Sequence, residues 1–347
     1  MDTLPHTTQL LYSQLMESLR AQSIPQTRGL SFVSKQIKDN RYWYAQYTMG
    51  SKKQQTYMGP DSEQLRHLMA SFETSLEEIA PLAEHTSGLV RMLKQSRCYS
   101  PLKGEFRVLQ MLDLMGYFKA GGILVGSHAF FSYANMLGVS FEGEDLRTSD
   151  IDLVPDSPIM LALPEDQEEF GQRVLASGYG FFEIPKLNNK HPSTSYMSRK
   201  ENIKLDLVTP LIGKPSGKPV YIASINGYAE PVRFLDYLLE DVQQAAIIEG
   251  SGILINIPHP ARYAIHKLVV AERRPASDTL KKRKDIRQAE LLLSILLDED
   301  TYSVELAVGA AHAMPAKFMT QVNRGLGKLQ PDTKERLSAI INSPSSN

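Results

Sequence analysis

The spacing of hydrophobic and polar residues changes several times along the chain. Apolar residues recur at helical spacing over about 7–21, from a cap at Asp61 or Ser62 to Gln95, and over 102–118. Between the first two helices, residues 32–57 instead interleave aromatic with polar positions, and glycines break the run. This alternation predicts a small antiparallel meander with a helix on either side.

From Gly121 the pattern becomes mixed. An apolar run to Val125, a helix with Phe130, Ala134 and Leu137 on one stripe, and a second apolar run at Asp150 predict strand, helix and strand. We expect further strands at 179–184, 193–198, 203–208, 220–222 and 253–257, and helices at 164–177, 232–240, 262–273 and 279–297. The predicted class is α/β (α+β). It comprises an N-terminal extension of β-meander and helices at 1–120, a core with a small mixed sheet at 121–258, and a helical domain at 259–347.

Composition narrows the class of protein. At 347 residues, 42% hydrophobic and 22% charged, the chain is typical of globular proteins with two or three domains. The single cysteine excludes an internal disulfide and a cysteine zinc site, and a lone thiol suits a reducing cytoplasm. The first residues lack a basic region followed by an apolar core, and no apolar run approaches a membrane span. We therefore expect a cytoplasmic protein that does not enter a membrane.

Two aspartates on one predicted strand are the first candidate for chemistry. Asp150 and Asp152 are two residues apart, so a strand presents both carboxylates on the same face. Neighbouring carboxylates repel each other, and a divalent cation such as Mg²⁺ relieves that repulsion. The alternative is a pair of solvated strand-edge aspartates.

Gly126 and Ser127 precede the helix that leads to this strand. Free backbone N–H groups and the helix dipole at such a start bind anions, including phosphate. The alternative is an ordinary serine N-cap without a ligand. Carboxylates for a metal beside an anion site favour nucleotide chemistry.

The order of strand, Gly-Ser, helix and Asp-x-Asp resembles the signature of the DNA polymerase β-type nucleotidyltransferases. The resemblance implies two catalytic metals, Mg²⁺ or Mn²⁺: Asp150 and Asp152 hold both of them, and a third carboxylate from a later strand helps to hold one. Asp206, between Leu205 and Leu207, matches that third position. It further implies transfer of a nucleoside monophosphate from an NTP bound at Gly126 and Ser127. The loop at 140–149 is longer than in the minimal members, and we expect it to be an insertion.

A second resemblance lies between Pro258 and Leu293. This segment is similar to the C-terminal part of abortive-infection-type toxin nucleotidyltransferases of bacteria. The likeness rests on a Lys-Leu pair at Lys267 and a Lys-Asp pair at Lys284-Asp285. It implies that Lys267 contacts the triphosphate and that Asp285 makes a polar contact in the nucleotide site. A basic, solvated helix face is the competing interpretation.

The acceptor is left open by these patterns. Basic residues gather in the meander, at Lys35, Arg41, Lys52 and Lys53, and again at 281–284, in a chain whose net charge is −1. Such segregation favours an RNA acceptor, a tRNA-like 3′ end, and the toxin-like resemblance adds a possible antitoxin protein as partner. The alternatives are nucleotidylation of a protein or of a small molecule such as an aminoglycoside, and a nucleotide- or RNA-binding module without turnover. The meander aromatics have their own two interpretations: a surface on which bases stack, or the core of a small sheet.

Overall fold

We describe a computed structural model of the chain. It describes residues 2–22, 31–37, 40–49, 52–141, 149–155, 169–186, 188 and 190–343. Most of the expected loop at 140–149 and the first part of the helix expected at 164–177 lie outside these residues. So do Arg28 and Lys38, and nothing is described for the side chains of Lys52 and Lys53.

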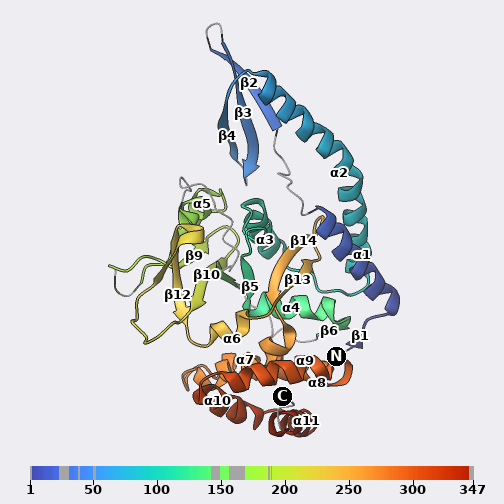
Figure 1. The fold of residues 1–347 in the computed structure, drawn as a ribbon, viewed down its shortest axis with the longest axis vertical. Coiled ribbons are helices and arrows are strands. Elements are labelled where there is room, and N and C mark those ends of the chain that lie inside the picture. The colour runs from blue at the N-terminus through green and yellow to red at the C-terminus, as the bar shows by residue number, and fades with distance from the viewer. Residues whose placement is uncertain are drawn as a thin grey trace.

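Helices and strands alternate through the middle of the chain, and helices alone form its C-terminal part (Figure 1). The strands are β1 (Asp2–Thr3), β2 (Ser31–Ile37), β3 (Asn40–Met49), β4 (Lys52–Pro60), β5 (Ile123–Val125), β6 (Val139–Ser140), β7 (Asp150–Val154), β8 (Phe181–Glu183), β9 (Ser195–Ser198), β10 (Ile203–Pro210), β11 (Val220–Ile222), β12 (Gly227–Val232), β13 (Val242–Ile247) and β14 (Ile253–Pro258). The helices are α1 (His6–Gln22), α2 (Glu63–Gln95), α3 (Lys103–Leu114), α4 (Gly126–Met136), α5 (Phe170–Ala176), α6 (Leu235–Leu239), α7 (Pro260–Arg273), α8 (Thr279–Glu299), α9 (Thr301–Ala313), α10 (Ala316–Leu326) and α11 (Pro331–Asn342), with a 3₁₀ turn at Ala223–Ile225. This mixture confirms the predicted α/β class.

The central sheet is mixed. Its strand order is β11-β12-β10-β7-β5-β14-β13, and β9, which also pairs with β8, continues from β10. β7 runs parallel to β10 and antiparallel to β5. The inward positions of these strands, such as Leu124, Leu153 and Leu205, are fully buried. The sheet therefore holds β7 rigidly between two neighbours.

The C-terminal helices lie below the sheet in Figure 1, and α7 leads directly out of β14. α7 and α8 pack against each other, and their apolar residues join the core of the sheet. Ala264, Leu268 and Leu292 have no exposed surface. None of the described helices is long and apolar enough to span a membrane.

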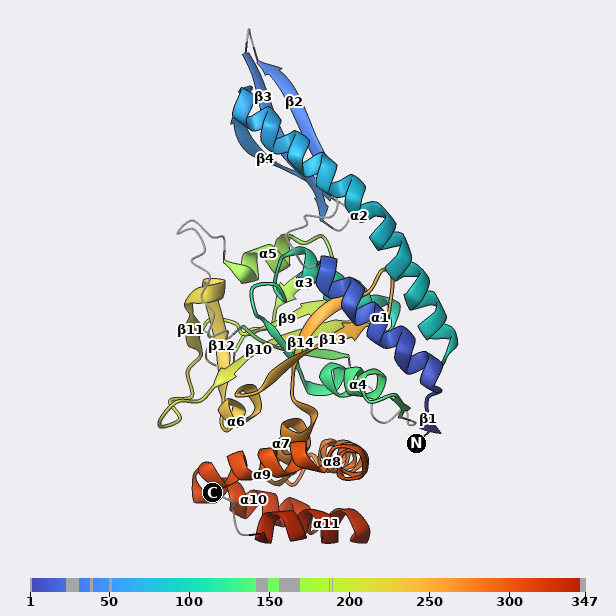
Figure 2. The same ribbon diagram turned by 45° about the vertical axis from the view of Figure 1, so that its right-hand side comes forward.

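The N-terminal meander forms a separate three-stranded sheet, β2-β3-β4. It stands at the far end of the long helix α2, away from the C-terminal helices (Figures 1 and 2). Ser62 caps α2 as expected, since its side chain accepts a hydrogen bond from the backbone N–H of Leu65. The predicted meander of 32–57 is confirmed within three residues at its C-terminal end and one at its N-terminal end.

Two strands differ from the sequence expectation. β12 and β13 occupy segments in which we predicted no strand, and β14 consequently has β13 as a neighbour at its edge. The sequence GYAEPV contains a proline, and VQQAAI has two adjacent glutamines, so neither has a clear strand pattern. The helix expected at 232–240 is reduced to α6, because β12 extends to Val232 and pairs with β10.

Candidate active site

The three aspartates are brought together by the pairing of β7 with β10. In the parallel register Asp152 lies opposite Asp206, and Asp150 lies opposite Lys204. Directly paired residues share a face of a sheet, so the three carboxylates and the lysine ammonium group lie on one face. The structure thus places Asp206 beside Asp152 although 53 residues separate them.

Gly126 and Ser127 lie against the same face, but not as a turn ahead of the helix. Val125 is the N-cap, and α4 begins at Gly126 itself, with Ser127 buried in its first turn. This corrects the expectation that a Gly-Ser turn precedes the helix. Gly126 has a φ of +68°, and a Cβ at this position would clash with the carboxylate of Asp152. Only glycine allows the start of α4 to approach Asp152 so closely.

Burial and neighbouring charges perturb Asp152. Burial, followed by the charge of Asp206, raises its pKa to about 6, and Asp150 adds to the rise while Lys267 and Lys204 oppose it. A cation bound beside this carboxyl would lower its pKa again, because it would offset the repulsion from Asp206 and Asp150. The position is therefore suited to a bound cation.

Asp206 has two partners that the sequence analysis did not identify. Ser195 Oγ on β9 donates to Asp206 Oδ1 at 2.5 Å, and Lys204 Nζ donates to Asp206 Oδ2 at 2.7 Å. Burial alone would lower the pKa of Lys204, but the hydrogen bond to Asp206 and the three carboxylates raise it above its usual value. Lys204 is two residues before Asp206 on the same strand, so period-two spacing could have revealed it.

Lys267 and Asp285 face each other across α7 and α8, as the toxin-like resemblance implies. Lys267 Nζ lies 2.8 Å from Asp285 Oδ1, and Arg274 Nε donates to Asp285 Oδ2. Burial would raise the pKa of Asp285, but the two cations lower it overall. Both carboxylate oxygens of Asp285 thus accept hydrogen bonds from cationic side chains, one from Lys267 and one from Arg274.

Lys284 turns out to belong to the charged site and not to a solvated face. Burial, followed by repulsion from Lys267, lowers its pKa to about 8, and Asp150 and Asp152 attract its charge. The preceding residues at 281 and 283 are exposed, so only part of the basic cluster at 281–284 faces solvent.

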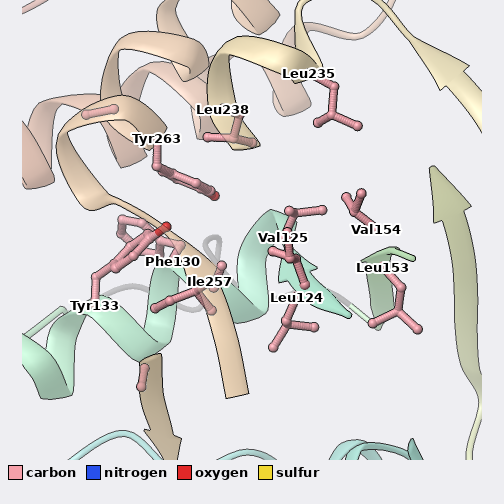
Figure 3. Packing of buried hydrophobic residues seen from close by; sticks show 14 of the residues in the cluster. Leu124, Val125, Phe130, Tyr133, Leu153, Val154, Leu235, Leu238, Ile257 and Tyr263 are labelled. Carbon is pink, nitrogen blue, oxygen red and sulfur yellow. The ribbon is translucent and has the colours of Figure 1, made fainter. Parts of the chain in front are cut away.

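Tyr263 joins the C-terminal helices to the start of α4. Its hydroxyl lies 2.8 Å from the carbonyl oxygen of Gly126 and 3.1 Å from Gln288 Oε1, and it is buried beside Phe130 and Tyr133 (Figure 3). A hydroxyl has one proton, and Gln288 Nε2 has no hydrogen-bond partner among the described residues. Exchanging the oxygen and nitrogen of this amide resolves both problems: Gln288 then donates to Tyr263, and Tyr263 donates to Gly126. No local sequence signal indicated this connection.

The residues present fit a divalent cation at Asp150 and Asp152. The observations are the raised pKa of Asp152 and the close approach that Gly126 permits. Oxygen donors of this kind suit Mg²⁺ or Mn²⁺. Within the described residues, however, no three His, Cys, Asp or Glu side chains are already arranged as a ligand set. Asp206 Oδ2 accepts a hydrogen bond from Lys204 Nζ instead.

Comparison with known proteins agrees with this geometry. The family described as Nucleotidyltransferase matches residues 104–313, which include both aspartate strands, α4, α7 and α8. No curated protein and no solved structure matches the chain. Since the match covers more than half of the 347 residues, the chain belongs to this nucleotidyltransferase family.

Proposed function

We propose that the protein transfers a nucleoside monophosphate from an NTP to the 3′ hydroxyl of an RNA acceptor and releases pyrophosphate. The observation that carries this proposal is the register of β7 and β10, which puts Asp150, Asp152 and Asp206 on one face beside the first turn of α4. The membership in a nucleotidyltransferase family supports it. We assign residues 121–258 to the catalytic core, flanked by the extension at 1–120 and the helical domain at 259–347.

Asp150 and Asp152 would hold the divalent metal, Mg²⁺ or Mn²⁺. When bound, such an ion neutralises charge on the triphosphate and lowers the pKa of a coordinated hydroxyl. The protein's own part is to hold the two carboxylates on β7, and to let the start of α4 approach Asp152 closely through Gly126.

The triphosphate would lie between the first turn of α4 and α7. Ser127 and the backbone N–H groups of that turn would bind its phosphates, and Lys267 adds a positive charge that already acts on Asp152. Asp285 and Arg274 fix the ammonium group of Lys267 in place. Asp285 therefore serves the nucleotide through Lys267, and Lys284 contributes a second positive charge nearby.

Asp206 would act on the acceptor hydroxyl. Lys204 and Ser195 orient its carboxylate, and they keep it on the face shared with Asp152. A hydroxyl that approaches between Asp206 and Asp152 would find an acceptor for its proton at Asp206.

The acceptor class rests on charge. The exposed basic residues of β2 and β3 and of the start of α8 suit a polyanion, and the toxin-like segment around Lys267 favours a tRNA-like 3′ end and a dedicated antitoxin partner.

The test is incubation of the purified chain with each α-³²P-labelled NTP, Mg²⁺ or Mn²⁺, and total cellular RNA or total protein. We expect label in RNA, at its 3′ end, and none after EDTA or with Asp152→Asn. Label in a protein band or in a small molecule would refute the RNA acceptor but keep the transferase. Absence of label in every fraction, with NTP still bound, would favour a non-catalytic module.

A further inference from the structure

One face of the N-terminal sheet presents tyrosines and a lysine to solvent. Val33 pairs with Tyr44, Lys35 with Tyr42, and Tyr44 with Tyr57, so these residues share a face. We call Lys35, Tyr42, Tyr44 and Tyr57 the tyrosine face.

The rings of the tyrosine face contact one another. The centroid of Tyr57 lies 5.5 Å from that of Tyr44 and 6.1 Å from that of Tyr42, and Lys35 Nζ lies 4.5 Å from the centre of the Tyr44 ring. Mutual packing of this kind orders the rings without burying them. Tyr57 keeps 54% of its surface exposed, and Lys35 is exposed as well.

Trp43 lies between Tyr42 and Tyr44 on β3 and therefore on the opposite face of the sheet. Its Nε1 donates to Asp61, next to the N-cap of α2, and α2 runs beside the sheet in both views (Figures 1 and 2). The Trp43 side chain thus ties the sheet to the start of its helix, and the exposed ring of Tyr57 lies on the other face.

Charge selects the kind of partner. Residues 28–57 contain six basic side chains and one acidic side chain, Asp39, within a chain of net charge −1. Lys35 is exposed on the tyrosine face, and Arg41 is exposed on the opposite face of the same sheet. An exposed aromatic ring beside a cation matches the bases and phosphates of an unpaired strand, because every base has a π-face and every linkage a negative charge.

We propose that the tyrosine face binds single-stranded RNA by stacking bases on Tyr57 and its neighbours, with phosphates on Lys35. The choice of RNA over DNA rests on the proposed acceptor, and the rest of the inference rests on the contacts, exposure and charge of the tyrosine face. The sheet stands at one end of the molecule, and β10, which carries Asp206, lies near its middle (Figure 1), so the surface would hold a part of the acceptor remote from its reacting end.

The experiment measures binding of fluorescent oligo-uridine of about 12 nucleotides to the full chain by anisotropy, without NTP or metal. Tyr57→Ala should weaken binding about fivefold or more, and Tyr57→Phe should restore it, because phenylalanine keeps the ring. Lys35→Gln should flatten the log–log salt dependence by about 0.7.

Tyr221 provides a matched control. It is 52% exposed, and its ring meets that of Tyr228 at 5.4 Å and 67°, close to the 5.5 Å and 63° of Tyr44 and Tyr57. Tyr221→Ala should bind oligo-uridine as the unmodified chain does. A double-stranded RNA of the same length should bind Tyr57→Ala and the unmodified chain equally, because its bases are already stacked.

Several results would overturn the proposal: unchanged oligo-uridine binding in Tyr57→Ala, an equal loss in Tyr221→Ala, or no rescue by Tyr57→Phe. Failure of the acceptor proposal looks different. In that case RNA takes up no label in the transfer assay, while oligo-uridine binding still depends on Tyr57.

Discussion

Around β7 and β10 the charged side chains are paired with one another and partly shielded from solvent, whereas on β2–β4 the ring of Tyr57 and the ammonium group of Lys35 are exposed to it. Asp206 is bonded by Lys204 and Ser195, and Asp285 by Lys267 and Arg274. The ring of Tyr57 contacts that of Tyr44 and remains half exposed. A prearranged site suits chemistry at one phosphorus atom, while an exposed surface suits a long, variable ligand.

The comparison predicts that the two regions fail separately. Changes in the aspartate site should abolish transfer and leave oligo-uridine binding intact. Changes on the tyrosine face should weaken oligo-uridine binding and leave transfer to a minimal acceptor intact.

The largest effect should come from Asp152→Asn. Removing one of the two carboxylates on β7 should lower the rate of NMP transfer by about a thousandfold or more, because the charge that holds the metal is lost. Transfer is measured with labelled NTP, and oligo-uridine binding of the same variant should match that of the unmodified chain. Transfer at the normal rate in this variant would refute the metal assignment.

Gly126→Ala should be nearly as severe. The added Cβ meets the Asp152 carboxylate, and alanine at a φ of +68° is strained, so transfer should fall by about a hundredfold and the melting temperature should drop. Gly309→Ala is the control, since its Cβ in α9 meets nothing within 4 Å and should stabilise the helix by about 1 kcal/mol. Equal melting temperatures and rates for the two variants would contradict the close approach.

Tyr263→Phe should lower kcat about tenfold with little change in KM for NTP. The hydroxyl fixes the carbonyl of Gly126, so its loss lets the start of α4 shift relative to Asp152. The control is Tyr133→Phe, whose buried hydroxyl donates instead to the carbonyl of Pro258 at 2.7 Å. Both variants should lose about 1 kcal/mol of stability, and only Tyr263→Phe should lose kcat; matching kinetics in the two would show a purely structural role.

The smallest effect concerns stability and pH. The pKa of Asp152 is about 6 in the folded chain, against 3.8 for an aspartate in its ordinary, solvated state, so the folded chain favours the protonated carboxyl. The unmodified protein should therefore lose stability as pH rises from about 4 to 6, and Asp152→Asn should avoid this loss. Above pH 6 we expect the variant to be more stable by about 1–2 kcal/mol without metal, with no difference at pH 4.

Denaturant melts of both proteins at pH 4 and pH 7.5 measure this difference, and Mg²⁺ should narrow it at pH 7.5. If Asp152→Asn is less stable than the unmodified chain at pH 7.5, then the ionised carboxylate of Asp152 stabilises the fold, and the prediction is wrong.

Much of this organisation follows from the sequence alone. Period-two spacing put Asp150 and Asp152 on one face, and the alternating aromatics of β3 predicted the meander. The helical spacing of α7 and α8 placed Lys267 and Asp285 on neighbouring helices. Local patterns suffice for these features, because side-chain direction within one strand or helix depends only on its own geometry.

Other features depended on contacts between distant segments. The pairing of Asp152 with Asp206 follows from strand register, and the bond between Tyr263 and Gly126 joins residues 137 positions apart. The same holds for the strands β12 and β13, which form because partners satisfy their backbone hydrogen bonds despite weak patterns of their own. The sequence by itself determined which side chains share a face of a strand or helix. Only the tertiary structure decided which of those faces meet. It also decided the burial that shifts the pKa values of Asp152 and Lys284, because burial is a property of the packed chain.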